Sequence, residues 1–231
     1  MKIKWLKFFS LLAGAALLSG PAIADSYTTS ASFNAAISGM SNVTTANFDS
    51  DTVGNIAQGQ IVDGITFNYN IDGGTGSLAI VSSLDYFDTT SPPNYLGSND
   101  PTTAALFPGD SITMSFASPI NALGLYIIGG PYSPGDFTLT SSTATALSSN
   151  VLEETLGDGG QVIFLGITSS SSFSSATLSL NSSAGELWNV DDITTAQGSP
   201  STQPVPEPGT LGLLLSGLAA AACLLLRKPA V

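Results

Sequence analysis

The chain has 231 residues, 43% of them hydrophobic and only 10% charged, with 17 acidic residues, no histidine, one cysteine, and five basic residues at Lys2, Lys4, Lys7, Arg227 and Lys228. Residues 8–226 therefore offer no His, Lys or Arg, and Cys223 lies in an apolar tail, which excludes Ser-His-Asp and Cys-His triads, Schiff-base lysines, zinc sites built from imidazole or thiolate, and arginine clamps for phosphate. Nucleic-acid binding is excluded as well, because it needs basic side chains near the phosphates.

The first 24 residues are predicted to be an export signal peptide. A basic stretch over residues 1–7 precedes an apolar run over residues 8–18, and Ala22 and Ala24 give the small-x-small pattern of a signal-peptidase site. We expect cleavage before Asp25. The alternative is an uncleaved membrane anchor, although this apolar run is short for crossing a bilayer.

Residues 25–196 are predicted to form one all-β ectodomain. They are rich in Ser, Thr, Gly and Asn, and their apolar residues come in short runs typical of strands, at 112–117, 137–140, 161–167 and 176–180. Turn signals between these runs indicate an antiparallel β-sandwich or jelly roll. One short N-terminal helix is expected over residues 32–40, with Ser32 as its N-cap.

Carboxylates are the only ionisable groups of consequence in this domain. Without Lys or Arg as partners, a crowded or buried set must stay near water, take up protons or bind a cation. Calcium is the predicted cation, because it prefers hard oxygen ligands. Asp191 and Asp192 are the first candidates, since strand neighbours point to opposite faces and one should face inward; Asp49 and Asp51 are the second. The alternative is that these aspartates form turns and solvated surface charge.

This domain also offers residues for two other kinds of site. Paired carboxylates can hydrolyse glycosides, with candidates at Glu153, Glu154, Glu186 and Asp191. Small Ser/Thr-rich sandwiches bind more often than they cut, so we expect a non-enzymatic protein without catalytic residues. Aromatic side chains can stack on sugar rings or simply fill the core, and the candidates are Tyr86, Phe87, Tyr95, Tyr126, Tyr132 and Trp188.

The C-terminal end is predicted to anchor the chain in a membrane. After a linker at residues 197–205, the uncharged run 209–226 is long enough, at about 1.5 Å per residue, to form a transmembrane helix of about 27 Å. Arg227 and Lys228 follow directly and predict a cytoplasmic C-terminus with the ectodomain outside.

Pro206, Glu207 and Pro208 stand just before this apolar run. The motif, the single hydrophobic span and the basic tail at residues 206–231 together resemble the PEP-CTERM sorting signal of Gram-negative bacteria. That resemblance implies processing by an exosortase and transfer of the domain from a membrane-anchored intermediate to the cell surface or exterior. It also implies an association with biofilms and extracellular polysaccharide. The alternative is a plain single-pass anchor with a proline-rich stalk.

Short motifs in the ectodomain resemble those of other exported PEP-CTERM proteins, at residues 33–37, 47–49, 64–67, 94–96 and 187–193. Such ectodomains look like carbohydrate-binding modules or galactose-binding-like sandwiches, some with structural calcium. We therefore expect an acidic surface or matrix protein that binds exopolysaccharide. The alternative function is a secreted, carboxylate-based glycoside hydrolase.

Overall fold

A computed structural model describes residues 24–84, 87–181 and 186–200. Within these ranges the chain is mostly antiparallel β-sheet with little helix, which confirms the all-β part of the predicted fold. Among the described helices, neither is long and apolar enough to cross a membrane. The predicted motif at Pro206–Pro208 and the predicted span 209–226 lie outside the described residues, as does the predicted signal peptide apart from Ala24.

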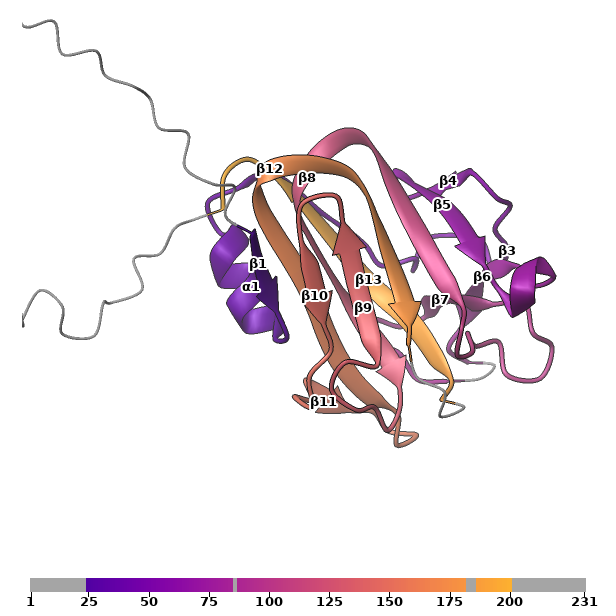
Figure 1. The fold of residues 1–231 in the computed structure, drawn as a ribbon. Helices are drawn as coiled ribbons and strands as arrows, with labels where there is room; N and C mark the ends of the chain where they lie inside the picture. The colour runs from indigo at the N-terminus through magenta and orange to yellow at the C-terminus, as the bar shows by residue number, and fades with distance from the viewer. Residues whose placement is uncertain (1–23, 85–86, 182–185, 201–231) are drawn as a thin grey trace, which may run out of the picture.

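The N-terminal half of the described chain forms short elements (Figure 1): β1 Ala24–Tyr27, α1 Ser30–Ile37, β2 Ser41–Ala46, β3 Gly54–Asn55, β4 Gln60–Val62, β5 Ile65–Asn70, the 3₁₀-helix η1 Asp72–Gly74, β6 Leu78–Ser82 and β7 Asn94–Ser98. The C-terminal half contains longer strands: β8 Ser111–Gly129, β9 Phe137–Ser141, β10 Thr145–Leu147, β11 Glu154–Thr155, β12 Gln161–Leu180 and β13 Trp188–Gln197. All four predicted strands are confirmed, and each lies within β8, β9 or β12.

Two long strands organise the sheet. β8 and β12, of 19 and 20 residues, pair with each other along both of their halves. The pairing is interrupted by register shifts between Thr168 and Ser175. Because such irregularities bend a strand, both strands arch over at the top of Figure 1. The predicted sandwich is therefore built from one continuous 13-stranded sheet that folds over on itself within the described residues.

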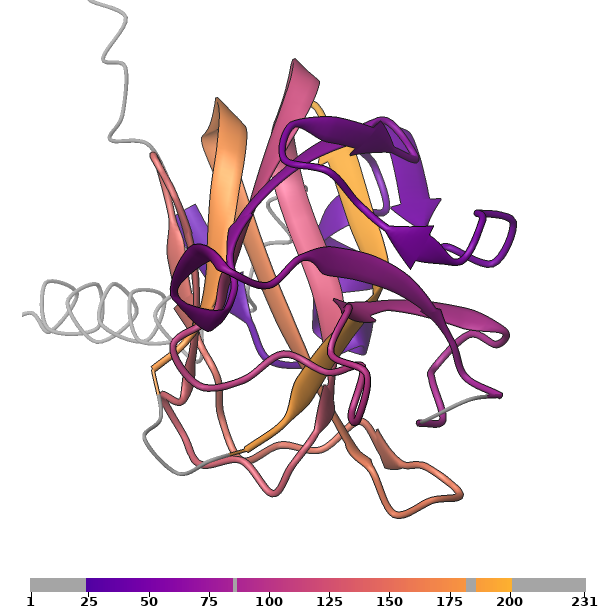
Figure 2. The ribbon, with the colours of Figure 1, turned by 90° about the vertical axis from the view of Figure 1, so that its right-hand side faces the viewer.

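The two halves of these strands carry different neighbours. The first half of β8 and the second half of β12 pair with β5 and β9, respectively. The other halves pair with β13 and β1, and β13 continues through β7 to β6 and β3. In the turned view, purple strands from the N-terminal half lie in front of the long strands (Figure 2).

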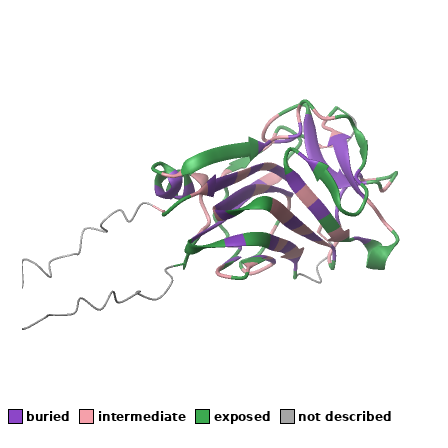
Figure 3. Ribbon diagram, turned by 90° about the horizontal axis from the view of Figure 1, so that it is seen from above, coloured by how far each residue is buried: buried purple, intermediate pink, exposed green. Residues whose placement is uncertain are grey.

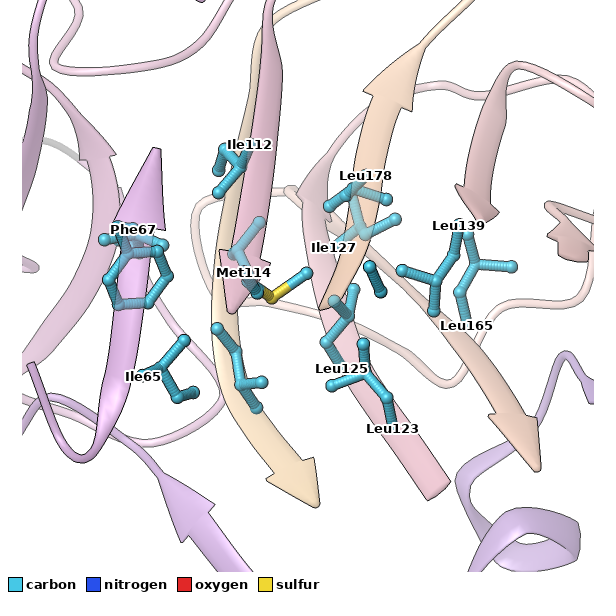
Figure 4. Close-up of a cluster of buried hydrophobic side chains, with 14 of the residues drawn as sticks. Ile65, Phe67, Ile112, Met114, Leu123, Leu125, Ile127, Leu139, Leu165 and Leu178 are labelled. Atoms are coloured by element: carbon cyan, nitrogen blue, oxygen red, sulfur yellow. The ribbon is translucent and has the colours of Figure 1, made fainter. Parts of the chain in front are cut away.

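A single large apolar cluster lies between these halves. Phe67 of β5 and Leu178 of β12 are fully buried in the same cluster as Leu125 of β8 and Leu165 of β12. Figure 4 shows these side chains pointing toward one another, and Figure 3 shows buried stretches alternating with exposed ones along the strands. Each such side chain contributes about 1.5–3 kcal/mol on burial, so the folded-over sheet is stabilised without a disulfide.

The N-terminal helix exists but is shifted from its predicted position. α1 begins at Ser30 and its N-cap is Thr29, whose hydroxyl accepts a hydrogen bond from the Ser32 amide at 3.4 Å. Thr29 has the extended backbone that an N-cap needs, whereas Ser32 already lies inside the helix. The helix ends at Ile37, so the prediction that it reaches Met40 was wrong.

A pair of glycines lets α1 lie against the sheet. Gly124 of β8 and Gly166 of β12 face each other in the ladder. A Cβ atom at Gly166 would stand 2.7 Å from the ring of Phe33 and 2.9 Å from that of Phe164. Gly124 is equally crowded by the same two rings. Phe33 is fully buried, so the helix docks where the sheet has no side chains.

Replacing Gly166 with Ala should loosen this contact. We expect the unfolding free energy to fall by about 1–3 kcal/mol, because two buried rings must move to admit a methyl group. Chemical denaturation monitored by circular dichroism measures the loss. Gly39→Ala is the matched control, since nothing lies within 4 Å of a Cβ at that position. An equal effect in both variants would contradict the docking argument.

Candidate functional site

The predicted aspartate pair lies at an irregularity in β13. Asp191 faces Tyr126 in the ladder with β8, and the register shifts before the next pair, at Thr194. Asp192 has a positive φ of 49°. This bulge turns both carboxylates toward one loop, residues 89–91, whereas a regular strand would point them to opposite faces.

Asp191 is fully buried and its Oδ2 atom accepts several hydrogen bonds from that loop. The Thr89 hydroxyl donates to it, and the Thr90 hydroxyl does so at 2.9 Å. The Ser91 amide and hydroxyl donate at 3.0 and 3.1 Å. The other oxygen, Oδ1, accepts the Asp192 amide at 2.8 Å. Asp191 therefore fixes the loop between β6 and β7 onto β13.

Burial raises the pKa of Asp191 to about 6, and the neighbouring Asp192 charge adds to the rise, while the bonds from Thr89, Ser91 and Thr90 oppose it. The pKa of Asp192 is also raised, mainly by burial, with a contribution from the charge of Asp49. The Asp192 carboxylate accepts from the Thr90 and Ser91 hydroxyls, each at 3.1 Å. Negative charge is thus concentrated in this part of the domain.

The four predicted calcium ligands divide between two places. Asp49 lies near Asp192 and accepts the Asn47 amide group at 2.8 Å. Asp51 instead lies beside Asp63, whose charge raises the pKa of Asp51 in addition to burial. Within the described ranges, no group of three or more His, Cys, Asp or Glu residues is arranged to hold a metal ion. Calcium binding by Asp191, Asp192, Asp49 and Asp51 stays a prediction.

A pocket of about 350 Å³ opens near the start of β13. Asn189 lines it from the strand itself, two residues before Asp191. Its walls come from the end of β8, the turn between β11 and β12, the segment before β13 and the loop after β6: Ile128, Gly129, Gly130, Asp158, Gly159, Gly160, Glu186, Leu187 and Phe87. The pocket therefore gathers residues that are about 100 positions apart in the sequence.

Two aspartates hold one side of this pocket together. The Asp88 amide donates to Asp158 Oδ2 at 3.2 Å, and the Asp158 amide donates to Asp88 Oδ2 at 3.0 Å. Asp158 Oδ1 also accepts the Gly160 amide at 2.8 Å. Because Phe87 precedes Asp88, these reciprocal bonds keep the ring next to the glycine turn. The loop is fixed at two points, here and at Asp191.

The aromatic side chains that are candidates for stacking on sugars lie in different places in the structure. Trp188 is fully buried and its Nε1 donates to the Phe107 carbonyl at 3.0 Å, so it belongs to the core. Tyr95 is fully buried in a smaller cluster, and Phe87 is partly buried against that cluster while it lines the pocket. Tyr126 and Tyr132 pack on other buried rings, and Tyr86 lies outside the described residues.

The sequence interpretation missed Asn189 and Asp158 as pocket residues. Asp158 lies in the glycine-rich run 157–160, whose composition is typical of a turn, and Asn189 was recognised only as part of the short motif at residues 187–193. The signal that could have found Asn189 is a polar residue between Trp188 and Val190, on a strand that is buried on both faces.

The family model of the PEP-CTERM protein-sorting motif matches residues 204–228. The chain carries a PEP-CTERM sorting signal. This match confirms the resemblance to the PEP-CTERM sorting signal that the sequence showed. The signal implies export, sorting to the cell surface and exosortase processing. No curated protein matches the chain. The K2 cleaved adhesin domain of Lys-gingipain is a similar solved structure, with 14% identity, a TM-score of 0.46, and coverage of 68% of this chain and 99% of that one.

Replacing Asp191 with Asn should flatten the dependence of stability on pH. The folded-state pKa of about 6 exceeds the ordinary 3.8, so the folded protein takes up a proton first and becomes more stable as the pH falls. This contribution reaches up to about 3 kcal/mol below pH 4 and is lost as the pH rises through 6. Denaturation at pH 4 and pH 7 measures it.

Asp25→Asn serves as the control, because Asp25 is exposed on β1. It should keep the wild-type difference between the two pH values. In the variant Asp191→Asn, the difference in unfolding free energy between pH 4 and pH 7 should be smaller. The remaining difference comes from other carboxyls with raised pKa, such as Asp192 and Asp110. An unchanged difference in Asp191→Asn would show that this carboxyl does not titrate as described.

Proposed function

We propose that this exported PEP-CTERM protein is a non-enzymatic surface or matrix module that binds extracellular polysaccharide. The sorting signal implies that the domain reaches the cell surface. The observation that supports binding is the pocket at Asn189, which combines an aromatic ring, carboxylates and an amide. Binding sites for small ligands commonly combine an apolar wall with a few polar groups of this kind.

The processing route belongs to the same proposal. The signal peptide, residues 1–24, starts export, and the helix at 209–226 holds a membrane-anchored intermediate with Arg227 and Lys228 in the cytoplasm. An exosortase then acts near Pro206–Pro208, after the linker 197–205. All five basic residues lie in the end segments, so the delivered domain is wholly anionic.

Changing Glu207 to Ala should block this processing. We expect the variant to stay in the membrane fraction at its larger size, while the wild-type chain appears as a shorter form outside the membrane. Immunoblots of cell fractions measure both. Glu186→Ala is the control for loss of a glutamate elsewhere, and it should be processed normally. Equal size and equal membrane retention of wild type and Glu207→Ala would mean that the motif is only a stalk.

Two of the four carboxylates considered for hydrolysis, Glu153 and Asp191, are engaged in structural contacts. Glu153 accepts the Ser30 amide at 2.6 Å and the Ser30 hydroxyl at 2.9 Å. Asp191 Oδ2 is occupied by the loop at 89–91. We therefore expect that the full chain, incubated with a panel of neutral and acidic polysaccharides, binds at least one of them and hydrolyses none.

Cosedimentation should show retention on at least one polysaccharide of that panel, and reducing-end assays should show no new ends. Release of sugar that is abolished in Asp191→Asn or Glu154→Gln would overturn the proposal in favour of a glycoside hydrolase. Absence of retention on every polymer, with and without calcium, would overturn it in favour of a coat component without a specific ligand.

A further inference from the structure

We infer that the pocket at the start of β13 is a subsite for one neutral sugar ring, in which Phe87 provides the apolar surface and the Glu186 carboxylate accepts hydroxyl hydrogens. This inference rests on the proposed polysaccharide binding and names the place and the chemistry of the contact. It follows from the charge of the pocket and the composition of its walls.

The charge of the pocket selects against acidic ligands. Asp158 and Glu186 both line it, and the sequence offers no basic side chain between residues 8 and 226. A uronate or sulfated sugar would bring a third negative charge into the pocket without a cation to offset it, and like charges in one small pocket repel each other. A neutral sugar brings hydroxyl groups, which donate strong hydrogen bonds to carboxylates.

Asn189 lines the pocket from β13, but its side-chain oxygen does not face it. The residue is only 3% exposed, and its Oδ1 atom lies 3.0 Å from the position that a Cβ would take at Gly97 of β7. The polar contacts available to a ligand therefore come from the carboxylates of the pocket.

Phe87 is held as part of the wall rather than as core. It packs on the small buried cluster that contains Val81 and Tyr95, and the reciprocal bonds of Asp88 with Asp158 fix the adjacent backbone. A partly buried ring fixed in advance loses little conformational freedom when a sugar ring packs on it.

Glycines line much of the remaining wall. At Gly129 the protein itself fills the place of a side chain, because a Cβ would stand 2.0 Å from the Tyr132 hydroxyl and 2.1 Å from the Leu187 carbonyl. Gly130, Gly159 and Gly160 also line the pocket without side chains. The resulting volume of about 350 Å³ is at the small end of ligand pockets. It suits one hexose ring rather than a long stretch of polymer.

The test titrates the full chain, purified in a detergent without sugar groups, with methyl glucoside, methyl galactoside and methyl mannoside. Calorimetry and ligand-observed NMR should detect saturable binding of at least one of them, with a Kd on the order of 1 mM. Methyl glucuronide should bind at least about tenfold more weakly. Failure of all three neutral glycosides to bind, or equal binding of the glucuronide, overturns the inference.

Variants locate the site. Phe87→Ala should weaken binding about tenfold, and Phe87→Leu, which keeps apolar packing on the cluster, should weaken it less. Glu186→Gln should also weaken binding, whereas Glu154→Gln and the exposed Leu152→Ala should not. Circular dichroism of each variant reports folding. Unchanged affinity in folded Phe87→Leu and Glu186→Gln overturns the subsite.

The two proposals fail in different ways. If wild-type protein cosediments with a neutral polysaccharide but binds none of the methyl glycosides, this subsite is wrong and the polymer is bound elsewhere. If it does neither, the proposed function fails together with the subsite.

Discussion

The fold depends on one electrostatic constraint: its carboxylates must be stabilised without any cationic side chain, because Lys and Arg occur only at the two ends of the chain. Neutral donors take their place. Asp110 accepts the Phe107 amide at 2.8 Å and the Asp72 amide at 3.0 Å, and Asp191 accepts the loop at 89–91. Since hydrogen bonds to charged groups contribute about 1.5–3 kcal/mol each, these acids act as anchors that join distant loops.

The degree of burial decides how each anchor titrates. Asp191 and Asp110 are almost fully buried and have raised pKa values, because desolvation outweighs the hydrogen bonds that they accept. Asp100 lies in contact with water, and bonds from Thr102 and Thr103 lower its pKa to about 2. Hydrogen bonds from amides and hydroxyls therefore favour the charged carboxylate at the surface, but in the interior they only partly offset the cost of burying it. Because their pKa values are raised, the buried acids make the folded protein more stable in a mildly acidic medium than in a basic one.

The strands could be predicted from alternation, but their continuity could not. Residues 161–167 and 176–180 were recognised separately, because the polar run between them lacks the apolar alternation of a strand. In the structure this run is where β12 bends and shifts register, so a lack of apolar residues marks an arch within one strand. One acid of the pair Asp191 and Asp192 was expected to face inward, and Asp191 is the one that is buried. Its partner loop lies 100 residues away, and no local pattern encodes a contact at that separation.

A subsite for one ring also fits the expected setting of the protein. A millimolar contact is too weak to hold a single domain on a polymer. If many copies of the domain are displayed on one surface and the polymer repeats the same sugar, the first contact holds the polymer near the other copies. Each later contact then forms at a high effective concentration. Fixed loops then matter more than tight contacts, because a rigid pocket loses little entropy at each of many binding events. The acid anchors supply that rigidity at Asp88, Asp158 and Asp191.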